Sequence, residues 1–273
     1  MKYKTKGQHC SVSALKTSNG ILVSEPKDKA NLLNQHFKSV FTKETQDESH
    51  EIPSKTEEKF SLKKIILGKP GIKKLVENLK QHKSPGPDGI SPKLLKLVPD
   101  EISDYLLLLF NKCLVLEKMP SMWKTANVTP VFKKGSRSSP ENYRPISLTS
   151  IICKMFEHII TSNLATYLEH HKLFNEDQFG FRKIRSCELQ LHRVCQDIAF
   201  ILDNGEEADL VFLDFTKAFD KVPHDLLIKK LASYGLQEDV IHLISSFLRG
   251  RTQGPGRWLG IRFCSSIIWC PTR

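Results

Sequence analysis

The chain has 273 residues, of which 40% are hydrophobic and 26% charged, and it carries a formal net charge of +11 at pH 7 with a pI of about 9.3. This content supports a folded core of one large or two modest domains and excludes a disordered chain. No apolar run approaches the roughly 20 residues of a membrane-spanning helix, and no signal peptide is expected. The charge favours a polyanionic partner, with a merely basic soluble protein as the plain alternative.

The seven cysteines are odd in number and include no C-x-x-C pair. Structural zinc sites usually take such pairs, and disulfide frameworks usually use an even number. We therefore expect reduced thiols in an intracellular protein, without a zinc site.

The N-terminal part alternates between polar stretches and one helix. Residues 1–28 are polar, with a turn at Ser18–Gly20, and apolar residues then recur at helical spacing in Lys29–Phe41. Residues 42–60 are charged and polar and are typical of a linker.

A loop with two prolines and two glycines, Lys83–Ile90, separates helices predicted around Leu75–Leu79 and Leu94–Val98. Such a loop is stiff at its prolines and open to unusual angles at its glycines. A simple helix–helix turn, closed by the side chain of Asp88, is the alternative to a functional loop.

The middle of the chain predicts core elements on either side of a basic turn. Ile102–Met119 is apolar enough for a core helix, and Ala126–Phe132 alternates like a strand. Ile151–Leu168 carries a 3.6-residue apolar stripe and predicts a second core helix. Between them lie Lys133–Lys134 and the sequence N-Y-R-P-I-S-L-T at 142–149, for which a solvated basic loop is the plain interpretation.

The sequence N-E-D-Q-F-G-F-R-K-I-R-S occupies residues 175–186, and an amphipathic helix is expected over Cys187–Leu202. Phe179 and Phe181 could stack on bases, but packing in the core is the favoured interpretation.

The stretch V-F-L-D-F-T-K-A-F-D-K-V-P-H at 211–224 organises the chain. Its apolar run Leu210–Leu213 predicts a buried strand that ends at Asp214. A carboxylate buried there is costly alone, so it should hold a metal ion or a partner. The alternative is an ordinary strand-to-helix connection with a capping aspartate. Helices are expected after Asp225, to Ser233 and then to Leu248.

The stretch at 211–224 resembles the first palm motif of reverse transcriptases, in the form found in jockey-like retrotransposons without long terminal repeats. The P-G-P-D-G loop, the sequence P-V-F-K-K-G…N-Y-R-P-I-S-L-T and the Q-F-G-F-R sequence resemble further motifs of the same family. Four motifs in one order, across residues 8–253, make a more specific signal than any motif alone.

This resemblance implies a role for each matching residue. The implied roles are Asp214 and the carbonyl of Phe215 as ligands of Mg²⁺, Phe219 as the steric gate that excludes a ribonucleotide, Arg144 with Lys133 or Lys134 as contacts of the triphosphate, and Pro85, Gly86, Arg182, Lys183 and Arg185 as candidate template contacts. A planar guanidinium suits phosphate oxygens, and Mg²⁺ takes oxygen ligands between substrate and carboxylates. The implied partners are an RNA template, a DNA primer and deoxynucleoside triphosphates, without a membrane.

The implied fold is α+β: the fingers and part of the palm of a right-hand polymerase, mostly helical before residue 205. We expect a segment that joins an absent endonuclease to the polymerase at 1–60, a fingers-like region at 61–205, the first part of the palm at 206–253 and an aberrant tail at 254–273.

The resemblance stops after Gln253, and the sequence has no Asp-Asp pair to supply the later palm carboxylates. A frameshift near residues 254–261 is our hypothesis for the tail, and the coding DNA tests it. We therefore expect a truncated domain that does not polymerise DNA as an isolated chain. The alternatives are a catalytically inactive remnant that binds nucleic acid, or an unstable pseudogene product.

Overall fold

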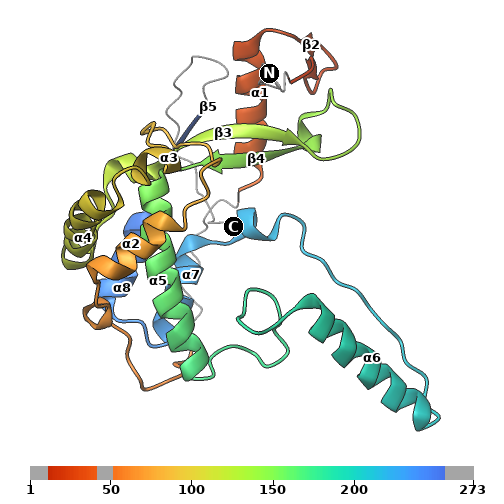
Figure 1. The fold of residues 1–273 in the computed structure, drawn as a ribbon. Coiled ribbons are helices and arrows are strands. Elements are labelled where there is room, and N and C mark those ends of the chain that lie inside the picture. The colour runs from red at the N-terminus through yellow and green to blue at the C-terminus, as the bar shows by residue number, and fades with distance from the viewer. Residues whose placement is uncertain (1–11, 42–51, 256–273) are drawn as a thin grey trace, which may run out of the picture.

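The computed structural model describes residues 12–41 and 52–255, which form a mixed α and β structure (Figure 1). The helices are α1 (Pro26–Ser39), α2 (Lys69–Glu77), α3 (Pro92–Leu95), α4 (Pro99–Leu116), α5 (Ile151–His170), α6 (Cys187–Asp203), α7 (His224–Ser233) and α8 (Glu238–Leu248). The strands are β1 (Leu15–Lys16), β2 (Leu22–Val23), β3 (Thr125–Phe132), β4 (Tyr143–Leu148) and β5 (Thr252–Pro255), and the 3₁₀ helices are η1 (Leu62–Lys64), η2 (Ser121–Lys124), η3 (Pro140–Asn142) and η4 (Ala218–Lys221).

The larger sheet has the strand order β4-β3-β5. β3 and β4 form an antiparallel hairpin, whereas β5 pairs with β3 in parallel, so Thr125 lies opposite Thr252. Gly254 and Pro255, the first two residues of the expected aberrant tail, continue β5. The rest of that tail lies outside the described residues.

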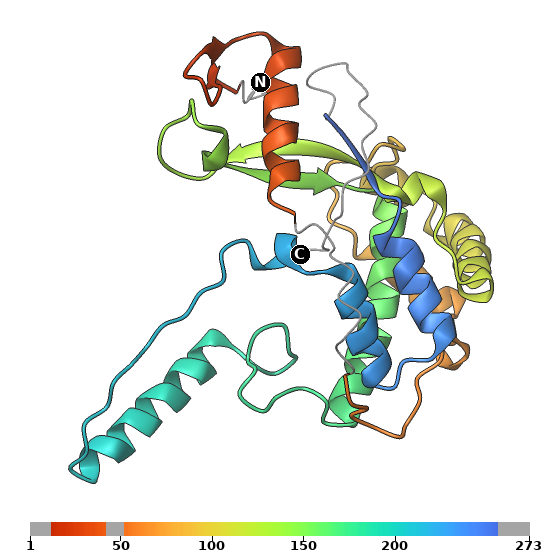
Figure 2. The ribbon, with the colours of Figure 1, turned by 180° about the vertical axis from the view of Figure 1, so that it is seen from behind.

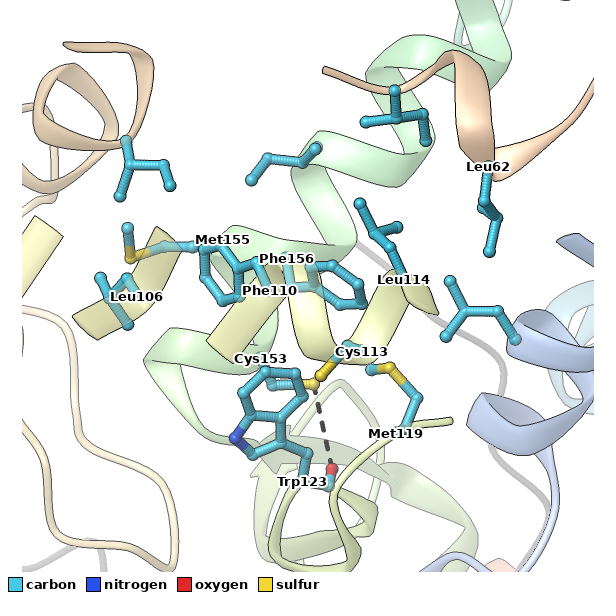
Figure 3. Packing of buried hydrophobic residues seen from close by; sticks show 14 of the residues in the cluster. Leu62, Leu106, Phe110, Cys113, Leu114, Met119, Trp123, Cys153, Met155 and Phe156 are labelled. Atoms are coloured by element: carbon cyan, nitrogen blue, oxygen red, sulfur yellow. Dashed lines mark hydrogen bonds between the residues drawn. The ribbon is translucent and has the colours of Figure 1, made fainter. Parts of the chain in front are cut away.

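The main core lies between α4 and α5, and three aromatic side chains form its centre (Figure 3). The ring centroid of Phe110 lies 5.1 Å from that of Phe156 and 6.2 Å from that of Trp123. Phe110 and Phe156 are fully buried. The Oγ of Ser150 accepts the backbone N–H of Cys153 and so caps the start of α5.

A second cluster joins the N-terminal segment to the hairpin. Leu33 and Phe37 of α1 pack with Leu15, Val128 and Tyr143. The amide of Gln253 in β5 also donates to Oδ1 of Asn34, at 2.5 Å. The segment expected to be only a connector therefore contributes to the same body as the sheet.

The second half of the expected linker is also packed. Phe60 is buried in the main core and forms a β-bridge with Leu236, and its amide donates to the carbonyl of Gly235. Residues 42–51 lie outside the described residues.

Most of the expected helices are confirmed within a few residues of their predicted ends: the helix in Lys29–Phe41 is α1, the core helices are α4 and α5, and the last two are α7 and α8. The strand at 126–132 is confirmed as β3. No helix in the described part of the chain is long and apolar enough to cross a membrane.

The buried strand expected at Leu210–Leu213 is wrong. This run is extended but pairs with no strand of the described residues, and Phe212 and Leu213 are 85% and 90% exposed. An apolar run becomes a buried strand only where a neighbouring strand binds its backbone and other elements cover its side chains. α6 has no buried residue either, and both segments project from the body of the molecule (Figures 1 and 2).

We predict that Phe110→Ala lowers the free energy of unfolding by about 3–5 kcal/mol, because it opens a cavity between Phe156 and Trp123. Chemical denaturation followed by circular dichroism measures this change. Leu108→Ala on the exposed side of the same helix is the control and should change stability by less than about 0.5 kcal/mol. Equal effects of the two substitutions would contradict the assignment of the core.

Candidate functional site

The β3–β4 hairpin presents basic side chains on the face that turns away from α1. Val131 lies directly opposite Arg144 in the ladder, and both are exposed. Their neighbours Phe132 and Tyr143 turn to the other face, where they pack together at 5.6 Å between ring centroids. The N–H of Lys133 donates to the carbonyl of Asn142, so the ladder continues one residue past β3. Alternation along the strand then places Lys133 on the face of Arg144.

Side chains in the turn hold the tip of this hairpin. The hydroxyl of Tyr143 donates to the carbonyl of Arg137 at 2.7 Å, and the guanidinium of Arg137 lies 4.6 Å from the ring centroid of Phe132. The amide of Asn142 donates to the carbonyl of Ser136. The turn is therefore built by local contacts, and Arg144 is left exposed beside it.

The P-G-P-D-G loop packs against the junction of β4 and α5. A Cβ added to Gly86 would lie 2.5 Å from backbone atoms of Thr149 and Ser150, so only glycine fits there. Asp88 accepts the N–H of Ile90 at 3.1 Å, as expected for a side chain that closes a turn. Gly86 is buried and Pro85 is half-buried.

The Q-F-G-F-R segment is tied to the end of α5. The guanidinium of Arg182 makes two hydrogen bonds to the carboxylate of Glu169, at 2.9 and 2.8 Å, and this contact holds the pKa of Glu169 below its usual range. Arg185 lies over the ring of Phe179 at 4.8 Å. Lys183 is exposed. Of these three cationic side chains, Arg182 is therefore the one whose guanidinium is engaged by a carboxylate of the described residues, that of Glu169.

Asp214 and Phe215 are both exposed in the extended segment after α6. Among the described residues, no group of three or more His, Cys, Asp or Glu side chains is placed to hold a metal ion. Phe219 lies in η4, and its ring is perpendicular to that of Phe181 with 5.9 Å between centroids. This contact brings two of the motifs together.

Three non-glycine residues of these two motifs have positive φ angles: Phe181, Ile184 and Lys217. Such angles cost free energy in side chains with a Cβ and often accompany functional segments. Burial lowers the pKa of Lys217. Burial also lowers the pKa of His36 in α1, and the nearby charge of Lys217 lowers it further. The motif loop therefore lies close to the N-terminal helix.

A cavity of about 620 Å³ lies between α1, α2, β4 and α5. Lys83, Lys154 and His158 line it, and so does Asp220. Lys154 lies at the start of the core helix predicted at Ile151–Leu168, and its position in the sequence does not place it with the others. The only signal was a basic residue at the start of a predicted core helix, which does not reveal what lies opposite.

A sequence profile of the family described as "Reverse transcriptase (RNA-dependent DNA polymerase)" matches residues 131–267. The chain is 32% identical over 256 residues to the RNA-directed DNA polymerase from the mobile element jockey of Drosophila funebris, covering 92% of this chain and 28% of that protein. It is 31% identical over 225 residues to a probable RNA-directed DNA polymerase from transposon BS of Drosophila melanogaster, covering 80% of this chain and 25% of that protein. The chain thus spans about a quarter of the length of these relatives.

We predict that Asp220→Asn stabilises the protein at pH 7 and that this gain disappears near pH 3. Burial raises the pKa of Asp220 above its value in the unfolded chain. The folded protein therefore favours the protonated carboxyl group of Asp220. This contribution to stability is fully present below the pKa of Asp220 in the unfolded chain, and it is lost as the pH rises through the pKa of Asp220 in the folded protein. Thermal unfolding of both proteins across this pH range measures the difference.

Asp209→Asn removes an equal charge from an exposed position and is the control for net charge. A stability gain from Asp220→Asn that is the same at pH 3 and pH 7 would contradict this explanation.

Proposed function

Because the chain belongs to the reverse transcriptase (RNA-dependent DNA polymerase) family, we propose that it forms part of an RNA-directed DNA polymerase of a jockey-like mobile element. In this proposal residues 61–205 are fingers-like and residues 206–253 begin the palm. The segment at 1–60 packs on the fingers-like region through Leu33 and Phe37 and so acts as part of it.

The observation that carries the proposal is the exposed pair of cations on one face of the hairpin, within the matched residues. Arg144 and Lys133 bind the phosphate oxygens of an incoming deoxynucleotide and neutralise their charge. Lys133 is favoured over Lys134 as the phosphate contact, because the alternation of side chains along the strand places Lys133 on the same face as Arg144. Phe219 excludes the 2′-hydroxyl of the sugar.

The contacts with the template divide into direct and supporting roles. Lys183, which is exposed, contacts the template backbone in this proposal, and Arg185 and Pro85 have the same role from their own loops. Arg182 and Gly86 act through others: Arg182 holds its loop to Glu169, and Gly86 holds its loop to the start of α5.

Members of this family use divalent metal ions. Asp214 and the carbonyl of Phe215 are the ligands that this chain offers, and metal ions there would stabilise the charge that develops on the transferred phosphate. The described residues do not fit a two-ion site, because Asp214 is exposed and no group of three or more His, Cys, Asp or Glu side chains among them is placed to hold a metal ion. No catalytic step by the isolated chain follows from this arrangement.

The same observation favours a second candidate function, a chain that binds nucleic acid without catalysis. Such a chain retains the cationic side chains of the hairpin and of the Q-F-G-F-R segment. Its binding of RNA would weaken steeply with salt.

We predict that Arg144→Ala and Lys133→Ala each weaken the binding of a deoxynucleoside triphosphate by about tenfold, since each removes a charged contact with phosphate. Isothermal titration calorimetry with the purified chain measures the affinity. Lys134→Ala is the matched control, and we expect a smaller change from it. If all three variants bind as the parent chain does, the proposed phosphate contacts are wrong.

We also predict that the isolated chain binds an RNA template with an annealed DNA primer but does not extend the primer in Mg²⁺. Gel-based primer extension beside a filter-binding assay measures both properties. Extension that Asp214→Ala abolishes would overturn the prediction of inactivity. A chain that binds neither primer–template nor deoxynucleotide would overturn the proposed function.

A further inference from the structure

The cavity of about 620 Å³ has apolar walls that come from parts of the chain far apart in sequence. Phe37 and Phe41 come from α1 and its end, Leu79 follows α2, Leu148 ends β4 and Met155 belongs to α5. Its volume falls in the range of roughly 300–1,000 Å³ that small-molecule sites occupy. Aromatic and aliphatic walls of this kind suit a flat heterocyclic ring.

Cations line the same cavity. Lys80, Lys83, Lys154 and His158 face it, whereas Asp220 is the one acidic residue among the described residues of its lining. No ion pair within 4 Å joins these three lysines to a carboxylate of the described residues. Burial lowers the pKa of Lys154, the carboxylate of Glu157 raises it, and the charge of Lys83, which repels the Lys154 ammonium group, lowers it by a smaller amount. An anion between the two ammonium groups would relieve this repulsion.

We propose that the cavity holds one unpaired nucleotide of a single-stranded RNA, with its base against Phe37, Phe41 and Leu148 and its phosphate between Lys83 and Lys154. This proposal rests on the proposed function. It extends that function to the N-terminal helix and the loop after α2, which precede the residues that match the family profile.

The charges favour a nucleotide within a strand over a free triphosphate. A nucleotide in a strand brings one phosphate charge, which together with the carboxylate of Asp220 balances the charges of Lys83 and Lys154. A triphosphate brings several more charges, and the carboxylate of Asp220 in the lining would oppose them. The exposed cations of the hairpin, Arg144 and Lys133, already offer a separate place for a triphosphate.

The test compares two double variants by fluorescence anisotropy with a labelled single-stranded RNA of about ten nucleotides. Lys83→Ala/Lys154→Ala should weaken binding by about tenfold or more. The slope of log affinity against log salt should become shallower by about 0.7, the contribution of the one phosphate contact that is lost in a single strand. Lys93→Ala/Lys112→Ala removes the same charge from exposed sites on α3 and α4 and should leave the slope nearly unchanged. Equal effects of the two variants would overturn the proposal.

A third variant tests the cavity without changing charge. Ser84 is exposed and lines the cavity, so Ser84→Trp should fill its mouth and weaken RNA binding without loss of thermal stability. RNA that carries 4-thiouridine should crosslink on irradiation to peptides that contain Phe37, Phe41 or Met155. Unchanged binding by Ser84→Trp, or crosslinks confined to other peptides, would overturn the placement of the base.

Two further measurements complete the test. The first distinguishes a nucleotide within a strand from a free nucleotide, and the second distinguishes this proposal from the proposed function. Uridine monophosphate that displaces the RNA as effectively as an equal concentration of unlabelled strand would overturn the assignment to a strand. The cavity variants should bind deoxynucleoside triphosphate as the parent does. If they also bind RNA as the parent does while Arg144→Ala weakens triphosphate binding, this inference fails and the proposed function stands.

Discussion

The close contact of Gly86 with the backbone of Thr149 and Ser150 is the constraint on which the site depends. It seats the loop after α2 at the point where β4 ends and α5 begins. Ser150 also caps α5, so the same few atoms fix the hairpin, the first turn of the core helix and one wall of the cavity. A side chain at position 86 would separate these three elements and move Lys83 away from Lys154.

The elements that packing determines locally could be predicted from sequence, whereas the contacts between them could not. The apolar stripe of α5 indicates which face of that helix is buried, and the alternation of apolar residues in β3 indicates a strand within a sheet. The run at Leu210–Leu213 has equally strong strand preferences, but no pairing strand in the described residues completes it. Strand formation depends on pairing with a second strand, and the sequence of the run does not indicate whether a second strand lies beside it.

The candidate site shows the same division. Arg144 and the pair of lysines were foreseeable from their motif, but the choice of Lys133 needed the register of the hairpin. Arg182 appeared as one of several free cations in sequence, and only the structure shows its two hydrogen bonds to Glu169. The cavity was beyond prediction, because Phe37, Lys83, Lys154 and Asp220 have no sequence relation that places them together.

The exposed apolar run before Asp214 also determines how this protein behaves among its own copies. Its backbone N–H and C=O groups are unpaired by strands of the described residues, and its side chains are β-branched, aromatic or leucine. Such an edge accepts any matching strand, including the same run of another molecule. This run therefore favours self-association at high concentration, against which a net charge of +11 supplies the opposing repulsion.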